Sequence, residues 1–311
     1  MPVSAAVLDL GGDVFQIDTM MGGAPGVTAA YLVRSSRPAL VETGGALSAP
    51  MIREGIATLG LAPEELATIV VTHIHLDHAG GVGDLAETYP NAEVVVHETG
   101  ARHLVSPDRL VASARQVYGP ALDRLFGELR PTETARIRAV AEVGSIDLGD
   151  GRRLGTYYSP GHARHHIGLL DSATGDLYVG DAAGIYLAGA DEVRASTPPP
   201  DFDLATAHAS IDRFEELAPT RLLFSHYGPA TDVAGVLARS REELYHWFAQ
   251  VSVARREAVD LDHAVELVRA RVASRYPCLR ADPERDRAIE GLSSVRSNVM
   301  GISRYLDLAG W

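Results

Sequence analysis

The chain has 311 residues, 46% of them hydrophobic and 22% charged, which is the size and composition of a folded globular protein with one large domain. Its 28 basic and 41 acidic residues give a formal net charge of −13, so we expect no nucleic-acid partner, because an acidic surface repels phosphates. All basic residues are arginine and the single cysteine is Cys278, which excludes a lysine Schiff base, an internal disulfide and a cysteine-ligated metal cluster.

Nothing in the hydropathy pattern predicts a membrane partner. No apolar run approaches the roughly 20 residues that cross a bilayer. The N-terminus, Met-Pro-Val-Ser-Ala-Ala, lacks the basic and apolar regions of a signal peptide. We therefore expect a cytoplasmic protein whose partner is a small-molecule substrate.

The first hundred residues alternate short β-rich runs with helical patterns. The β-branched and apolar runs predict strands at 14–17, 30–33, 39–41, 68–71 and 94–96. Helical periodicity predicts a helix over 49–59 and a second one between Gly81 and Pro90. A longer helical insertion, rich in arginine, is expected at about 103–140.

Strands resume after this insertion and then stop. They are expected within 145–158 and at 167–170, 177–179 and 222–224, with a helix capped by Asp203 and ending at Leu217. After Thr231 the pattern predicts only amphipathic helices, three or four of them, up to Trp311. The main domain is therefore expected to cover residues 1–230, and residues 231–311 to form a C-terminal helical extension packed on it.

Four side chains that can bind metals fall within six residues, directly after the strand expected at 68–71. They are His73, His75, Asp77 and His78. In an extended backbone alternate side chains point the same way, so one cation can contact both His73 and His75. Once the chain turns, Asp77 and His78 can face a second cation, and we attribute the turn to the glycines at 80 and 81. This spacing predicts a metal site.

The pattern His-x-His-x-Asp-His after a strand resembles the signature of the metallo-β-lactamase-fold hydrolases. Three later motifs extend the resemblance over about residues 12–230: Pro160-Gly161-His162, Gly180-Asp181 and Ser225-His226. The resemblance implies an α+β fold, an αββα sandwich of two mixed β-sheets, followed here by the helical extension. It also implies a first metal held by His73, His75 and His162. A second metal would be held by Asp77, His78 and His226, and both would be bridged by Asp181.

The same resemblance implies two divalent cations, zinc first, with manganese or iron as alternatives. A hydroxide bound to them would attack a small ester, thioester or lactone, and Asp77 could pass a proton to the leaving group. Phosphoesters and β-lactams are less favoured substrates. The alternative within this fold is a mononuclear-iron persulfide dioxygenase.

Two departures from the family pattern indicate which branch of the family this chain resembles. Asp181 stands where one class of β-lactamases has a cysteine, so the site resembles glyoxalase II and lactonases. Glu42-Thr43-Gly44 stands where the family commonly has Asp-Thr-Gly, and we expect Glu42 to keep a hydrogen-bonding role behind the metals.

Residues beside the expected ligands give further candidates. One of His165 and His166 is expected to orient a ligand or contact substrate, with His166 the first choice, and Tyr227 to donate a hydrogen bond to a substrate oxygen. His103 has no context that suggests a ligand. The C-terminal helices, which carry Trp247 and Phe248, could close over the site, form a homodimer interface or pack as core. The sequence leaves these alternatives open, as it does the position of the 103–140 insertion relative to the site.

Overall fold

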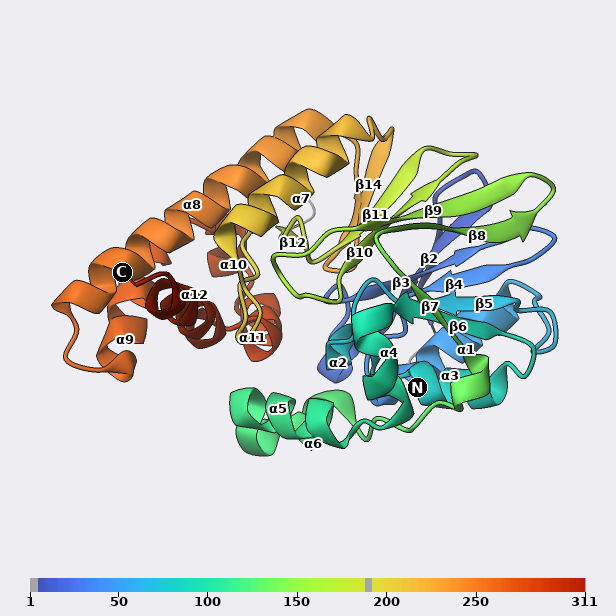
Figure 1. The fold of residues 1–311 in the computed structure, drawn as a ribbon, viewed down its shortest axis with the longest axis horizontal. Helices are drawn as coiled ribbons and strands as arrows, with labels where there is room; N and C mark the ends of the chain where they lie inside the picture. The colour runs from blue at the N-terminus through green and yellow to red at the C-terminus, as the bar shows by residue number, and fades with distance from the viewer. Residues whose placement is uncertain (1–4, 188–191, 311) are drawn as a thin grey trace.

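The structure is a computed structural model that describes residues 5–187 and 192–310. Two mixed β-sheets face each other, and helices cover both outer faces (Figure 1). The C-terminal helices gather on one side of this sandwich (Figure 1). The αββα architecture and the helical extension expected from the sequence are thereby confirmed.

The first sheet contains seven strands in sequence order: β1 (Val7–Asp9), β2 (Val14–Asp18), β3 (Ala29–Val33), β4 (Ala39–Val41), β5 (Thr68–Val70), β6 (Glu93–His97) and β7 (Ile137–Val140). Strands β1 to β4 pair antiparallel, whereas β4 to β7 pair parallel. Parallel neighbours need crossover connections, usually helical. These contain α1 (Ala49–Thr58), α2 (Leu76–Ala79), α3 (Val82–Thr88), α4 (Glu98–Val105), α5 (Asp108–Tyr118) and α6 (Leu122–Phe126).

The second sheet has the order β15 (Gly228–Ala230), β14 (Arg221–Phe224), β11 (Asp176–Gly180), β10 (Ile167–Asp171), β9 (Arg152–Tyr158) and β8 (Val143–Gly149). Strands β11 and β14 are parallel and are connected through α7 (Leu204–Glu216), and the remaining pairs are antiparallel. A separate hairpin consists of β12 (Ile185–Leu187) and β13 (Glu192–Arg194). Short 3₁₀ turns lie at Met21–Gly23, Ala46–Ser48, Gly119–Ala121 and Thr134–Arg136.

Apolar side chains fill three layers. Between the sheets, Tyr31 and Val70 of the first sheet pack with Leu154 and Leu223 of the second. Ile52 of α1 and other helix residues cover the outer face of the first sheet. Phe214 of α7 and Trp247, which is completely buried, belong to the cluster on the outer face of the second sheet. Trp247 is therefore a core side chain and not part of an exposed interface.

The extension contains five helices within the described residues, more than the three or four expected. They are α8 (Val233–Glu257), α9 (Leu261–Val272), α10 (Pro277–Ala281), α11 (Pro283–Leu292) and α12 (Val295–Ala309). Asp232, Asp260, Asp282 and Ser294 each accept a backbone hydrogen bond at a helix start, so the boundaries follow from capping side chains. In the described part of the chain, no helix combines the length and apolar character needed to span a membrane.

The sequence pattern mispredicted two other features. The helices of the expected insertion end at Phe126, and Ile137–Val140 forms β7 on the first sheet. The strands β1, β12, β13 and β15 were not predicted. Each has three residues, too few for an alternating pattern to show.

Candidate metal centre

All seven expected ligands lie at one edge of the sandwich, in segments that follow strand ends. The chain after β5, including α2, carries His73, His75, Asp77 and His78. Asp181 follows β11 and His226 follows β14, and their strands are parallel neighbours, so the two carboxyl ends meet. His162 lies in the loop between β9 and β10. We call these seven side chains the donor cluster.

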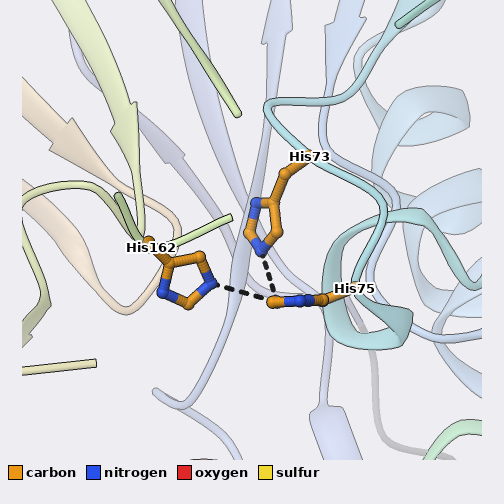
Figure 2. Close-up of side chains that lie close together, drawn as sticks. All are labelled: His73, His75 and His162. Atoms are coloured by element: carbon orange, nitrogen blue, oxygen red, sulfur yellow. Dashed lines mark hydrogen bonds between the residues drawn. The ribbon is translucent and has the colours of Figure 1, made fainter. Parts of the chain in front are cut away.

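Three histidines form the first group of the cluster. Nδ1 of His75 lies 3.0 Å from Nε2 of His73 and 3.0 Å from Nε2 of His162 (Figure 2). The three rings come from the loop after β5 and from the β9–β10 loop, and they point toward one another (Figure 2). One ring nitrogen from each residue lies within 4.8 Å of the others, a spacing that a single metal ion can fill.

Asp77, His78 and His226 form the second group, and all three are buried. Nε2 of His226 lies 3.2 Å from Nε2 of His78 and 3.3 Å from Oδ2 of Asp77. His73 and His78 also form a group of possible ligands with Asp181. The two groups are therefore neighbours and not separate sites.

Asp181 lies between the two groups. Its Oδ1 is 3.3 Å from Nε2 of His78 and 3.5 Å from Nε2 of His226, whereas its Oδ2 is 3.6 Å from Nε2 of His162. The Ser196 hydroxyl donates to Oδ2 at 3.1 Å. Oδ1 is buried and accepts no hydrogen bond from the described residues. One carboxylate oxygen thus faces each group.

Hydrogen bonds behind the rings orient their lone pairs toward the cluster. Nδ1 of His162 lies 3.0 Å from the carbonyl of Ser196, and Nδ1 of His226 lies 3.1 Å from the carbonyl of Val27. A carbonyl only accepts, so in the neutral rings Nδ1 carries the hydrogen and Nε2 presents a lone pair. The lone pairs of these Nε2 atoms and the unbonded Oδ1 of Asp181 repel one another. A cation bound between them removes this repulsion. The donor set therefore fits metal ions.

The ionisation of His75 and of the two carboxylates of the cluster also suits cations. Burial and the charge of His162 lower the pKa of His75 to about 3. Although burial opposes the shift, the charge of His78 lowers the pKa of Asp77 to about 2. Against the same effect of burial, neighbouring histidines hold the pKa of Asp181 well below its usual value. Both carboxylates are therefore ionised at neutral pH.

Glu42 supports the second group from behind. Its Oε1 lies 3.3 Å from Nδ1 of His78 and accepts hydrogen bonds from the hydroxyls of Thr72, at 2.5 Å, and Ser225, at 2.9 Å. Its φ of 69° is uncommon for a residue with a side chain. The hydrogen bonds of its side chain hold the Glu42 backbone in this conformation. The Glu42 carboxylate, although one methylene longer than the family's aspartate, has the hydrogen-bonding position that the sequence suggested.

Gly180 lets the chain before Asp181 pass close to His166. Gly180 has φ +51°, and a Cβ there would lie 2.4 Å from Nε2 of His166. The amide of Asp181 donates to this Nε2 at 3.1 Å, and Nδ1 of His166 lies 2.8 Å from the Ser159 hydroxyl. His166 thus contacts the Asp181 backbone from behind, which is the geometry of a positioning residue. Its predicted part in catalysis stays a prediction.

The glycines after His78 have a different role from the expected one. Gly80 and Gly81 have φ of −61° and −88°, so the turn does not need glycine's conformational freedom. A Cβ on Gly80 would lie 2.9 Å from Cα of Gly45, and one on Gly81 would lie 2.7 Å from the carbonyl oxygen of Thr43. Close packing against this loop requires the two glycines, and the explanation by a tight turn is wrong.

A cavity of about 270 Å³, which we call the inner cavity, lies over the donor cluster. Its lining contains donors from both groups, among them His75, Asp77, His162 and Asp181. Residues of α5 line one part and Leu292, Ser293 and Ser297 of the extension line another. Both the insertion and the C-terminal helices therefore border the site.

Other residues of this lining also carry polar groups. His103 and Arg109 line the inner cavity, as does His165, whose Nδ1 accepts the amide hydrogen of Ile74 at 3.3 Å. His103 was expected to be an ordinary histidine, and no local pattern distinguishes it. The Tyr227 hydroxyl donates to Oδ2 of Asp18 at 3.0 Å, and Tyr227 is not part of this lining within the described chain.

Tyr118 was also missed. It lines the inner cavity, and its hydroxyl donates to the carbonyl of Leu292 at 2.8 Å, which connects α5 to the end of α11. Burial, with the charge of Asp77, raises its pKa well above the usual value, so the hydroxyl stays protonated. The partner is 174 residues away in the sequence, so no local signal could have revealed this contact.

A sequence profile of the metallo-beta-lactamase superfamily matches residues 23–226, which include the whole donor cluster. The metallo-beta-lactamase fold-containing protein ST1585 of Sulfurisphaera tokodaii is 34% identical over 168 residues, 53% of this chain and 62% of the relative. The crystal structure of ST1585 matches with a TM-score of 0.59 at 29% identity and covers 72% of this chain and 81% of that one.

Two further relatives have names that state an activity. A hydroxyacylglutathione hydrolase of Synechococcus sp. is 30% identical over 168 residues, 54% of this chain and 53% of the relative. The acyl-coenzyme A thioesterase MBLAC2 of Gallus gallus is 32% identical over 167 residues, 49% of this chain and 56% of the relative. The chain thus spans between half and two thirds of the length of these curated relatives.

Proposed function

The chain belongs to the metallo-beta-lactamase superfamily, and on this premise we propose that it is a metal-dependent hydrolase of small thioesters and carboxylic esters, including lactones. The observation that carries the proposal is the position of Asp181, with one carboxylate oxygen toward each group of donors. Relatives named hydroxyacylglutathione hydrolase and acyl-coenzyme A thioesterase support an acyl substrate.

In this proposal His73, His75 and His162 would hold one divalent cation and Asp77, His78 and His226 a second, with Asp181 placed between the two groups of donors. Imidazole and carboxylate donors without a thiolate suit zinc, with manganese or iron as alternatives. When bound, two such cations supply Lewis-acid activation of water and of the substrate carbonyl.

Asp77 is the side chain that we assign to proton movement. It lines the inner cavity, and its low pKa keeps it ionised at neutral pH. Its place in the lining makes it the carboxylate positioned to take up a proton and to return it to the departing thiol or alcohol. Its Oδ2, 3.3 Å from Nε2 of His226, is kept close to the second group.

The walls of the inner cavity bind the rest of the substrate and exclude water. Leu110 and Val117 of α5 and Leu292 of the extension supply apolar surface, which stabilises the carbon skeleton of an acyl compound. The hydroxyl of Tyr118 is already engaged with the Leu292 carbonyl. We therefore assign Tyr118 to holding the wall and not to the reaction.

Metal content and thioester cleavage measured on the same sample test the proposal. Full-length protein purified without chelators is expected to contain about two divalent cations per chain by elemental mass spectrometry. It is also expected to release a free thiol from S-acetyl- or S-lactoyl-thioesters. Asp181→Ala is expected to lower kcat/KM by more than about 100-fold, since losing even a residue behind a ligand costs 10- to 100-fold. Asp147→Ala, at a side chain 72% exposed, is the matched control and should be unaffected.

The persulfide dioxygenase is the alternative that this experiment separates. It requires one iron per chain and oxygen consumption with a glutathione persulfide, without thiol release from thioesters. That result would overturn the hydrolase. Wild-type turnover in Asp181→Ala would remove the assignment of the donor cluster.

A further inference from the structure

A second cavity, of about 630 Å³, adjoins the inner cavity, and we call it the outer cavity. Ser113 and Val117 of α5 and the prolines Pro199 and Pro200 line both cavities. The remaining lining comes from Gln116 of α5, the end of α8, the α8–α9 connection, the start of α9 and α12. The four shared residues place the two cavities side by side.

The sizes of the two cavities indicate that the inner one holds only part of a long substrate. At about 30 Å³ for each water-sized group, a volume of about 270 Å³ holds about nine non-hydrogen atoms. The outer volume of about 630 Å³ holds about twenty more by the same measure. An acyl compound with a chain longer than about eight carbons exceeds the inner cavity, and the adjoining outer cavity offers room for its end.

The charged groups in the outer lining have partners within the lining or on the adjacent backbone. Arg255 pairs with Asp307, and Nε of Arg304 donates to the carbonyl of Pro200 at 3.2 Å. Asp260 accepts a backbone hydrogen bond at the start of α9. The outer lining thus contains two arginines and two aspartates. Their charges cancel, so the lining does not favour an anionic ligand.

The remaining outer lining is largely apolar, and part of it is exposed. Val259 is 86% exposed and Leu261 is 37% exposed, and both line the cavity together with Ala264 and Met300. Exposed apolar side chains gathered beside a cavity indicate a ligand or partner surface. The surface is continuous with the lining that covers the donor cluster, and this continuity favours the substrate itself as the occupant.

We propose that the outer cavity binds the distal part of a long, uncharged acyl chain whose carbonyl lies at the donor cluster. This inference rests on the proposed hydrolase function and narrows its substrates to medium- and long-chain acyl thioesters or esters. Val117 and the two prolines contact the middle of the chain, and Val259, Leu261 and Met300 contact its end.

A series of thioesters that differ only in acyl length tests this site on the metal-loaded, full-length protein. We would measure kcat/KM for the acetyl, butanoyl, octanoyl and dodecanoyl thioesters of N-acetylcysteamine. Each buried methylene is expected to raise kcat/KM by about fourfold. The rise should continue beyond octanoyl, because the outer cavity accepts the added carbons. A plateau at octanoyl would show that only the inner cavity is used and would overturn the proposal.

Two substitutions separate the outer cavity from general effects on the enzyme. Val259→Asp places a carboxylate against the chain end and is expected to lower the ratio of dodecanoyl to acetyl kcat/KM by about tenfold. Ser113→Trp narrows the shared lining and is expected to lower the same ratio. The matched controls are Val143→Asp, at a position 70% exposed on β8, and Ala112→Trp, on the same helix as Ser113. Neither position is part of the two linings, so both variants should keep the wild-type ratio of dodecanoyl to acetyl kcat/KM.

The remaining outcomes distinguish failure of this site from failure of the proposed function. If no thioester of any length is cleaved, the hydrolase proposal fails, and calorimetric titration with the uncleaved, uncharged dodecanoyl thioester of N-acetylcysteamine then tests the outer cavity. Binding to the wild type that weakens about tenfold in Val259→Asp supports the site, and equal binding overturns it. Val259→Asp could instead keep the wild-type ratio of dodecanoyl to acetyl kcat/KM and change the oligomeric state measured by light scattering. That result would assign the outer cavity to contact with a second copy of the chain and overturn the acyl-chain site.

Discussion

The donor cluster and the walls of the inner cavity are built in different ways. The cluster residues follow strand ends of two hydrogen-bonded sheets, and His73, His78 and their neighbours are almost completely buried. The residues of helix α5, which forms one wall, are half-buried or exposed, and its Tyr118 is hydrogen-bonded to the opposite wall through the Leu292 carbonyl. The comparison teaches that the chemical centre is rigidly positioned by the sheets, whereas the substrate walls depend on a few contacts between helices.

The largest expected effect is the difference between substituting a residue of the donor cluster and substituting a wall residue of the same inner cavity. His75→Ala removes a cluster donor and should lower the metal content and reduce kcat/KM by more than about 100-fold. His103→Ala changes a wall residue of the same cavity and should keep the metal content of the wild type. Elemental analysis and thioester kinetics on both variants check this prediction. Equal metal loss in the two variants would contradict the division into cluster and walls.

The reactivity of Cys278 reports on the docking of the extension. Its thiol donates to Oε2 of Glu192 at 3.0 Å, and burial together with Glu192 raises its pKa to about 11. Only the thiolate reacts, so alkylation by iodoacetamide at pH 8.5 should be about 100-fold slower than for a free cysteine, and faster as the pH rises. Glu192→Gln should accelerate it. If the walls are independent of the cluster, a chelator should leave the alkylation rate unchanged.

Glu42→Gln should weaken metal binding by 10- to 100-fold without unfolding the protein. The amide keeps an acceptor for the hydroxyls of Thr72 and Ser225 but loses the negative charge behind His78. Competition with a fluorescent zinc chelator measures the affinity. Glu54→Gln, at an exposed position on α1, is the control and should bind metal like the wild type. An unchanged affinity in Glu42→Gln would show that Glu42 does not act on the metals.

The smallest expected effect concerns the contact between the walls. Tyr118→Phe removes the hydrogen bond to Leu292 and should weaken the attachment of α5 by about 1 kcal/mol, which is about a fivefold increase in local opening. Hydrogen exchange of the α5 amides measures this change. Tyr245→Phe, at a side chain 58% exposed, should leave the exchange unchanged. Faster exchange across the donor cluster as well would contradict the separation of the two regions.

Much of the fold and the composition of the site could be read from the sequence because both depend on local patterns. The β-branched run at 68–71 and the glycine before Asp181 mark strand ends, and the residues that follow such ends meet at one edge. Three-residue strands such as β12 and β13 escaped prediction, since they exist only through pairing with each other. Likewise, the strand β7 depends on its parallel partner β6 and not on its own weak pattern.

The sequence by itself determined which residues gather at the candidate metal centre: spacing after a strand indicated His73, His75, Asp77 and His78, and the family resemblance added His162, Asp181 and His226. Only the tertiary structure decided what surrounds them. Helices α4 and α5 bring His103 and Arg109 into the lining of the inner cavity opposite Leu292 of α11, and the approach of the β9–β10 loop to the end of β11 places His166 behind Asp181. These contacts join residues far apart in the chain, so their geometry follows from how the helices pack and not from any local motif.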